Sequence, residues 1–552
     1  MRSISIAVAV LVILACGVDV PPRAGSAPGN SASVVNYDFT IILPLSGRSI
    51  RGCAAITAVR KRDADRLSLD LADLVVDSVY VDGRPAKYSR EPSSIDLFIG
   101  SAERIRSDTA IVTVWYGGEV HDGLIIRTDR RGRWAAFGDN WPDRARRWLP
   151  TIDRPDAKAT VSWNVIGPAE RNVVANGQFI EQRAFPPDKQ NPSVPRSLTR
   201  WKTYRPIPSY LMVIAAGPLM QVDLGLTAAG LSEFPPGVQQ SVYAVPELSD
   251  YLPGPFKHAG DIVTLFSTLV APFPYEKLAH VQSSTRYGGM ENASAIFYAD
   301  NVFMRRSVST GLIAHETAHQ WFGDAVTPKS WGHLWLSEGF ASYFEQLWVE
   351  RSEGAGAFRN GMKKLRREIL QSDVTFSRPV IDTLQTNLVA LLNTNSYQKG
   401  AWVLHMLRSM LGDTLFFSGI REYYRRHRHS SATSDDLCEV LEMVAHKNLR
   451  WFFDQWLRRP GMPEVSASWR FDDRTRTLTV EVIQSGIGEP YAFPLTVEVL
   501  TSQRKSSIVV LQIPAERKVT PIVPVILSAE PGSVVFDPRA GLLASIKSGS
   551  EQ

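Results

Sequence analysis

The chain contains the stretch Ala314-His315-Glu316-Thr317-Ala318-His319-Gln320-Trp321-Phe322-Gly323-Asp324, in which two histidines are four residues apart. Residues with this spacing lie one above the other on the same face of an α-helix. Ser309 or Thr310 is available to cap such a helix at its start. Of the ten histidines in the chain, no other two are four residues apart. His315 and His319 are therefore predicted to direct two imidazoles at one point, as a zinc site requires.

A carboxylate can complete this metal site. Glu338 follows nineteen residues after His319, in the first turn of a second expected helix, where an acid suits the helix dipole. The apolar stripe of that helix consists of Phe340, Tyr343, Phe344, Leu347 and Trp348. Two histidines and one carboxylate leave a fourth position open, which distinguishes a catalytic zinc site from a closed structural one. Glu316 lies at the edge of the histidine face, so it can reach a water at that position without being a ligand.

The residues alone leave a second interpretation open. A short His-Glu-x-x-His motif can occur by chance in a surface helix. An acid such as Glu338 in the first turn of a helix is also common, because it complements the helix dipole. Under this interpretation the two histidines and Glu338 are ordinary helix residues that hold no metal.

Length and composition indicate a globular protein with several domains. A chain of 552 residues is too long for one core, so about two to four domains are expected. Hydrophobic residues make up 44% of the chain, which excludes a disordered protein. The 61 basic and 56 acidic residues nearly balance, which describes a solvated surface. No nucleic-acid motif surrounds the arginine clusters at 144–147 and 425–428, so no nucleic-acid partner is expected.

The three cysteines form no C-x-x-C pair, so they predict neither a metal knuckle nor a disulfide framework. Cys53 and Cys438 are either joined by a single bridge or remain two separate thiols. Their wide separation in the sequence favours separate thiols.

The first sixteen residues predict export from a bacterial cell. Met1-Arg2 is followed by an apolar run from Ile4 to Ala15, which is too short to span a bilayer and is typical of a secretory signal. The run ends at Cys16 in a sequence that resembles the lipobox of bacterial lipoproteins, which implies a lipid anchor facing the periplasm or the exterior. The alternative is an ordinary signal peptide and a secreted protein. Residues 17–35 are rich in Gly, Pro, Ser and Ala and are expected to form a flexible linker.

The remaining chain predicts a multidomain α+β fold. Short alternating strands over 36–220 predict a β amino-terminal domain, either a sandwich or a saddle-like sheet. Residues 221–240 are expected to be a connection with Gly and Pro, and helical periodicity dominates the rest of the domain assigned to 221–463. Strands return over 464–540 as a small β-sandwich, and 541–552 is expected to be a loose tail.

Several patches of this sequence resemble one family. The histidine motif together with Trp335-Leu336-Ser337-Glu338-Gly339-Phe340-Ala341 resembles the gluzincin metallopeptidases. Gly288-Gly289-Met290-Glu291-Asn292 is similar to the G-x-M-E-N motif of the aminopeptidase N and leukotriene-A-hydrolase family, and Tyr397-Gln398-Lys399-Gly400 is similar to its Y-x-K-G motif. Ala145-Arg146-Arg147 with Pro150 resembles its amino-domain signature. The resemblance runs from about residue 40 to 540 and is to a short bacterial member.

The resemblance implies a fold and an activity. The expected fold is a saddle-like β amino domain, a thermolysin-like, mostly helical catalytic domain and a small carboxy-terminal β-sandwich. The expected activity is that of a zinc-dependent aminopeptidase, which hydrolyses the amino-terminal residue from peptides through a metal-activated water. One Zn²⁺ per chain would be held by His315, His319 and Glu338. The substrates would be peptides with a free amino terminus, and the sequence sets no oligomeric state.

The resemblance also assigns roles to single residues. Glu316 would act as the general base, and Tyr397 would donate a hydrogen bond to the oxyanion. Glu291 would pair with the α-ammonium of the substrate. Asp139 is a candidate for a second amine anchor, because the family's positions fall near Asp139 and Trp141. The other residues expected to contact substrate are Gly288, Gly289, Met290 and Asn292.

Two departures from the family pattern are Gly289, where Ala is common, and Asp324, where Asn is common. Two other functions remain open. One is a zinc hydrolase that acts on a different substrate, such as an epoxide. The other is an inactive peptide-binding lipoprotein, which predicts decay of the site at Glu316, and Glu316 is intact.

Overall fold

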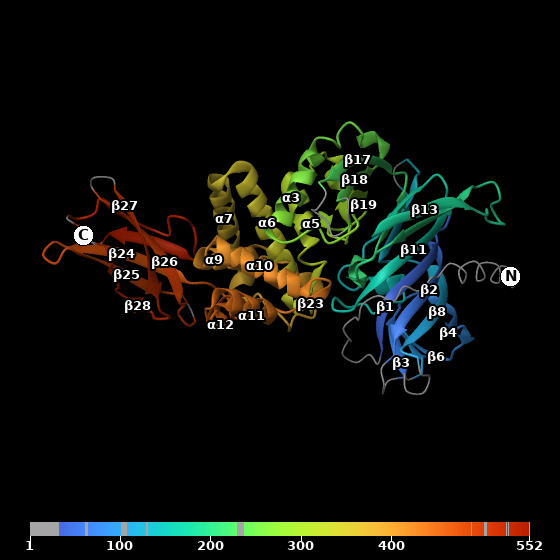
Figure 1. Cartoon of the computed structure of the whole chain (residues 1–552), viewed down its shortest axis with the longest axis horizontal. Coiled ribbons are helices and arrows are strands. Elements are labelled where there is room, and N and C mark those ends of the chain that lie inside the picture. The colour runs from blue at the N-terminus through green and yellow to red at the C-terminus, as the bar shows by residue number, and fades with distance from the viewer. Residues whose placement is uncertain are drawn as a thin grey trace.

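The structure is a computed structural model that describes residues 32–550, except for 61–64, 101–106, 129–130, 229–233, 235–236, 487, 502–504, 526 and 528. A β-rich amino part, a mainly helical middle part and a β-rich carboxy part follow one another along the long axis (Figure 1). The predicted signal peptide, Cys16 and most of the predicted linker lie outside the described residues. Residues 33–35, predicted to belong to the linker, are instead the start of strand β1, Ser33–Ile42.

The amino part is built on a large mixed sheet with the strand order β13-β14-β11-β1-β2-β8-β4-β5, in which β1 and β11 are parallel. Its strands are β1 (Ser33–Ile42), β2 (Ser49–Val59), β4 (Val75–Val81), β5 (Arg84–Pro85), β8 (Thr109–Glu119), β11 (Lys158–Pro168), β13 (Gln178–Phe185) and β14 (Arg196–Lys202), with β15 (Ile207–Pro208) against β11. Smaller sheets contain β3 (Arg66–Asp70), β6 (Tyr88–Glu91), β7 (Ser94–Phe98), β9 (Leu124–Thr128), β10 (Trp134–Gly138), β12 (Asn172–Ala175) and β16 (Ile214–Gly217). The β domain predicted from alternating residues is therefore present.

The middle part has a sheet in the order β17-β18-β19-β21-β20 and a set of helices. The strands are β17 (Met220–Thr227), β18 (Val238–Ala244), β19 (Lys277–Ser283), β20 (Gly289–Met290) and β21 (Ala295–Ala299), and β22 (Val326–Pro328) pairs with β23 (Ser430–Ala432). The helices are α3 (Ala259–Leu269), α4 (Asp300–Met304), α5 (Thr310–His319), α6 (Trp335–Glu353), α7 (Ala355–Leu370), α8 (Asp373–Ser377), α9 (Gly400–Leu411), α10 (Asp413–His427), α11 (Ser434–Ala445) and α12 (Arg450–Leu457).

The predicted connection over 221–240 is wrong at residues 221–227 and 238–240, because β17 and β18 pair there as antiparallel strands. The strand β17 lies at the edge of its sheet, and three of its eight residues are exposed to solvent. Its polar residues and Gly225 therefore resemble a loop in the sequence, although they alternate with partly buried apolar residues.

The carboxy part packs two sheets, in the orders β28-β25-β24-β31 and β27-β26-β30. The strands are β24 (Glu464–Asp472), β25 (Thr477–Gln484), β26 (Phe493–Leu500), β27 (Ser506–Ile513), β28 (Lys518–Val519), β29 (Ile522–Val523), β30 (Ser533–Phe536) and β31 (Ser545–Ser550). The loose tail predicted from residue 541 is wrong up to residue 550. Leu542 and Leu543 are buried, and β31 pairs in parallel with β24, so this segment completes the sheet.

Local sequence explains how α5, α6 and α9 come together. The Ser309 hydroxyl caps α5 by accepting a hydrogen bond from the Leu312 amide at 3.1 Å. The helices α6 and α9 cross where two glycines meet, and a Cβ on Gly339 would lie 2.8 Å from the Cα of Gly400. The absence of side chains at this crossing lets the two backbones approach closely.

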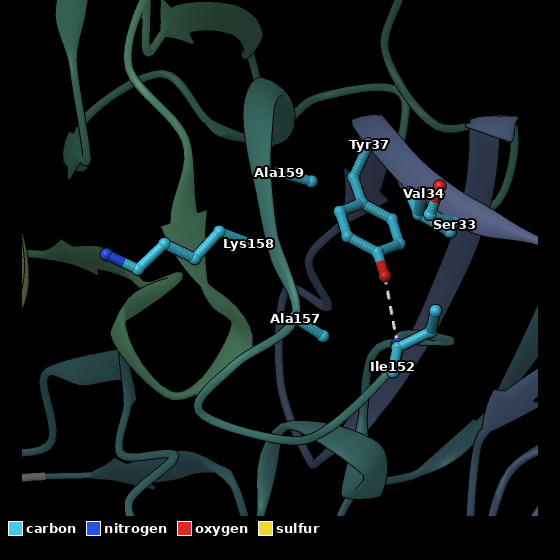
Figure 2. Close-up of a pocket in the computed structure, with 7 residues that line it drawn as sticks. All are labelled: Ser33, Val34, Tyr37, Ile152, Ala157, Lys158 and Ala159. Carbon is cyan, nitrogen blue, oxygen red and sulfur yellow. Dashed lines mark hydrogen bonds between the residues drawn. The ribbon is translucent and has the colours of Figure 1, made fainter. Parts of the chain in front are cut away.

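The amino and middle parts share a buried contact through Lys158 on β11. Figure 2 shows that its side chain points away from Tyr37, whose hydroxyl accepts a hydrogen bond from the Ile152 amide at 2.9 Å. The Lys158 ammonium instead donates to the carbonyl oxygens of Asp324 and Ala325, both at 2.8 Å. These two residues follow α5, so the amino part holds the segment that connects α5 to α6.

Cys53 on β2 and Cys438 on α11 are buried, and no disulfide joins these two described residues. Their positions in different parts of the fold agree with the separate thiols that the sequence favoured. Within the described part of the chain, no helix is both long and apolar enough to cross a membrane.

The buried His280 on β19 should make the fold sensitive to acid. Burial lowers its pKa from 6.5 to about 3, while its Nδ1 lies 2.9 Å from the Tyr298 hydroxyl. Below pH 6.5 the unfolded chain gains a proton that the folded chain does not, so stability falls as pH falls toward 3. Between pH 7 and 5, wild type should lose about 2 kcal/mol more unfolding free energy than His280→Gln, measured by urea denaturation. If the unfolding free energies of wild type and His280→Gln fell by the same amount between pH 7 and 5, the acid sensitivity would not come from His280. His121→Gln, at an exposed position, is the control.

Candidate metal centre and substrate cavity

The helices α5 and α6 bring the three predicted metal ligands together. The imidazole rings of His315 and His319 are 4.9 Å apart between centroids. Glu338, in the first turn of α6, places Oε2 3.4 Å from Nε2 of His315 and 3.3 Å from Nε2 of His319. The ligand atoms of these three residues all lie within 4.8 Å of one another.

The chemistry of this cluster fits one zinc ion. Oε2 of Glu338 is buried and has no hydrogen-bond partner among the described residues, although it lies between two imidazole nitrogens. Burial alone would raise the pKa of Glu338, but His319 and His315 outweigh it and hold the pKa low, so the group is a carboxylate. Two nitrogens and one carboxylate oxygen are the ligand set of catalytic zinc sites with an open position.

Three residues to which the sequence analysis gave no role at the metal site lie against the Nδ1 atoms of the imidazoles. Nδ1 of His319 lies 3.1 Å from the carbonyl oxygen of Phe322 and 2.9 Å from the hydroxyl of Ser337. A proton on this Nδ1 is donated to the carbonyl, which leaves Nε2 free to bind a metal. Nδ1 of His315 lies 3.6 Å from Oε2 of Glu345. Glu345 is seven residues after Glu338, so the helical repeat places both on one face of α6, and this spacing could have identified it.

Removing the Glu345 carboxylate should weaken zinc binding. Outer carboxylates fix the tautomer and orientation of a ligating histidine, and their loss typically costs about 10–100-fold in metal affinity. We therefore expect Glu345→Gln to show a zinc dissociation constant about 10-fold or more above wild type in competition with a chromophoric chelator. Glu353→Gln, at an exposed position near the end of the same helix, should bind as wild type does. An unchanged constant in Glu345→Gln would remove Glu345 from the metal site.

The carboxylate of Glu316 lies directly against the backbone of β20. A Cβ on Gly289 would be 2.1 Å from Oε1 of Glu316, so this position of the carboxylate requires a residue without a side chain. Burial raises the pKa of Glu316 to about 7, although His315 and His319 oppose the shift. A carboxylate that titrates near neutral pH can both accept and return a proton.

A cavity of about 430 Å³ contains nearly all the residues predicted to act on substrate. The lining residues are Trp141, Tyr287, Gly288, Gly289, Met290, Glu291, Ser309, Leu312, His315, Glu316, His319, Glu338, Glu345, Leu392 and Tyr397. The ring of Tyr397 stacks on the imidazole of His315, with centroids 6.0 Å apart and planes at 10°. Burial and the neighbouring Glu338 hold the pKa of Tyr397 well above its usual range, so its phenol keeps the proton that it would donate.

The loop that carries Glu291 is fixed by buried hydrogen bonds. Gln320, which follows α5, donates to the carbonyl oxygen of Glu291 at 2.9 Å and accepts from the amide of Ser294 at 2.8 Å. Asn176 of the amino part donates to the carbonyl oxygen of Ala293 at 2.8 Å. The sequence analysis assigned no role to Gln320 or Asn176, and their long-range contacts leave no local signal.

The structure does not bring Asn292 or Asp139 to the cavity wall. Asn292 is fully buried behind the wall. Asp139 is also fully buried, and its Oδ2 lies 2.9 Å from a guanidinium nitrogen of Arg144, while its Oδ1 accepts a hydrogen bond from Thr285 at 3.3 Å. Asp139 therefore lies away from the cavity wall and is already paired with Arg144, so this geometry lends no support to the prediction that it anchors an amine. Trp141, two residues later, lines the cavity instead.

Comparisons with known proteins agree with this geometry. The model of the peptidase M1 N-terminal domain matches residues 34–211, and that of the peptidase family M1 domain matches residues 258–456. Aminopeptidase N of Lactococcus lactis subsp. lactis is 26% identical over 82% of this chain and 54% of its own length. Glutamyl aminopeptidase of Sus scrofa is 29% identical over 60% of this chain and 35% of its own length. The chain thus spans about half or less of the length of these curated relatives.

The fold also resembles a solved structure. An M1 zinc metallopeptidase from Deinococcus radiodurans superposes with a TM-score of 0.66 at 23% identity, and the match covers 79% of this chain and 95% of that chain. The two family models match the β amino part and the mainly helical middle part of this fold, in that order. The chain therefore belongs to peptidase family M1, the aminopeptidase N family of gluzincin metallopeptidases.

Proposed function

We propose that this protein is a zinc-dependent aminopeptidase that removes the amino-terminal residue from peptides. One observation carries the proposal: the carboxylates of Glu291 and Glu316 and the ring of His319 present ligand atoms within 4.8 Å of one another. In an amino-terminal residue, the α-nitrogen and the carbonyl carbon are only about 2.5 Å apart. The Glu291 carboxylate, at this distance from the metal ligand His319, can hold the ammonium while the adjacent carbonyl lies at the metal.

The residues divide the chemistry among themselves. When bound, zinc would supply a Lewis acid that polarises the scissile carbonyl. It would also lower the pKa of a water, so that this water can lose a proton and attack the carbonyl near neutral pH. Glu316 accepts the proton of the attacking water and returns a proton to the leaving nitrogen. The phenol of Tyr397 donates a hydrogen bond to the oxygen that becomes negative. Glu291 holds the ammonium by a charge-assisted hydrogen bond, which selects the first peptide bond for cleavage.

The first sixteen residues support an exported location, with Cys16 as a lipid attachment site. A peptidase placed there would meet peptides in the periplasm or outside the cell. The proposal for the location rests on the sequence alone.

Glu316→Gln tests the general base. The amide keeps the size of the side chain but cannot accept a proton, so turnover of leucine p-nitroanilide should fall about 10²–10⁴-fold. The zinc content, measured by atomic absorption, should stay at one ion per chain because Glu316 is not a ligand. Loss of zinc from this variant would contradict the assignment of Glu316 as the base, and full activity would contradict the mechanism.

Glu291→Gln tests the exopeptidase assignment. Breaking a buried charged hydrogen bond typically costs about 2–5 kcal/mol, so kcat/KM for leucine p-nitroanilide should fall about 30-fold or more. Wild type should leave the N-acetyl form of this substrate intact. Equal cleavage of free and acetylated substrates by wild type would show that Glu291 does not select the amino terminus. Absence of both reactions in zinc-loaded wild type would favour the inactive peptide-binding hypothesis.

A further inference from the structure

The strand β27, Ser506–Ile513, forms an open edge of the carboxy β-sandwich. It lies at one end of the order β27-β26-β30, and its eight residues pair with β26 without a register shift. Among the described residues, no backbone group of β27 makes a hydrogen bond to another backbone group outside this pairing. Figure 1 shows the strand in the carboxy part, at the end of the molecule opposite the amino part. A row of backbone donors and acceptors is therefore available to another strand.

Other edge strands of this protein carry features that hinder such pairing. Charged side chains, bulges and short length are the usual protections of a sheet edge. The strands β13 and β17 have both charge and a register shift, and β3, β9 and β31 each contain a charged residue. Among the described edge strands longer than four residues, only β27 has no charged residue, and it contains no proline. The edge of β27 is thus unprotected.

Two apolar side chains lie on the solvent face of β27. Ile508 is 44% exposed and Val510 is 52% exposed. The alternating residues Val509 and Leu511 instead pack against the core of the sandwich. Side chains directly opposite each other on neighbouring strands stabilise a sheet, and β-branched residues are favoured in such pairs. A strand added beside β27 would therefore cover both exposed residues with its own side chains.

We propose that β27 pairs with β27 of a second copy of this chain, antiparallel and about a two-fold axis at Val509. This axis places Ile508 opposite Val510 of the second copy, and Val510 opposite Ile508 of that copy, so each exposed residue gains an apolar cross-strand partner. An axis at Val510 would instead place Ile508 opposite Gln512. Because β27 carries no charge, its pairing with itself brings no like charges together.

The pairing would produce a closed, symmetric dimer. A two-fold contact uses the same surface on both chains, so assembly stops at two copies. The sheet β27-β26-β30 of each copy would join the other into one continuous sheet. The substrate cavity is lined mainly by the middle part, so the dimer contact goes beyond the proposed catalytic function and does not depend on it.

Sedimentation of the purified protein tests this contact. Wild type is expected to approach twice the mass of one chain between about 1 and 100 µM, because a small interface binds in the micromolar range. Ile508→Lys combined with Val510→Lys should raise the dissociation constant about 30-fold or more, since lysines would face each other across the axis. Ile508→Lys combined with Val510→Glu should restore the dimer, because the new lysine then faces the new glutamate of the other copy. Glu498 lies opposite Ile508 on β26, so the single chain can accept a lysine there.

Each outcome supports or overturns the pairing. A wild type that stays monomeric over the whole concentration range overturns the proposal, as does a dimer that survives the two lysines. Failure of the lysine–glutamate variant to restore the dimer would exclude an axis at Val509. Ile522→Lys, at an exposed apolar position on β29, is the matched control and should dimerise as wild type does. Hydrolysis of leucine p-nitroanilide and the thermal midpoint report whether each variant is folded, and Val510→Lys alone supplies the test if the two-lysine variant is not.

Discussion

Buried negative charge is the constraint on which the centre of this protein depends. Glu291, Glu316 and Glu338 are each more than nine-tenths buried, and no Lys or Arg is found among the described residues that line their cavity. Burial raises the pKa of Glu291 and of Glu316, so cations from outside the chain are needed to favour their charged forms. A metal ion between the imidazoles and an ammonium beside Glu291 satisfy this need at two adjacent points. Structure and proposed chemistry therefore follow from the same electrostatic requirement.

The amino domain is part of the site and not only a neighbour of it. Lys158 holds the carbonyl groups of Asp324 and Ala325 after α5, and Asn176 holds the loop beyond Glu291. Trp141 enters the cavity wall from the same domain. These contacts are buried and polar or aromatic, so they are specific in direction, and a small shift of the amino domain would displace the residues that act on substrate.

The sequence predicted the helix pair because helical spacing is a local property. His315, His319 and Glu338 needed only the periodicity of two helices to be placed on facing surfaces. Glu345 lay within reach of the same argument, one further heptad along α6. Asn176 and Lys158 did not, because their partners are more than a hundred residues away in the chain.

Asp139 shows a second limit of prediction from the sequence. Asp139 and Trp141 are only two residues apart, and the sequence did not indicate which of the two side chains faces the cavity. The edge strand β17 and the strand β31 were missed because partly exposed strands contain the polar residues and glycines of loops. Residues whose role depends on a distant partner were thus harder to identify than residues that act through their own helix.

The contact between Gly339 and Gly400 has a consequence for how this enzyme family can vary here. Gly339 directly follows the ligand Glu338 on α6, and Gly400 begins α9 three residues after Tyr397. A methyl group at either position would clash with the opposite backbone, so the two helices would have to separate. The Glu338 carboxylate and the Tyr397 phenol would then move apart. The two glycines thus set the distance between α6 and α9, and with it the separation of Glu338 and Tyr397. Natural variation at these two positions should be confined to changes that keep this distance.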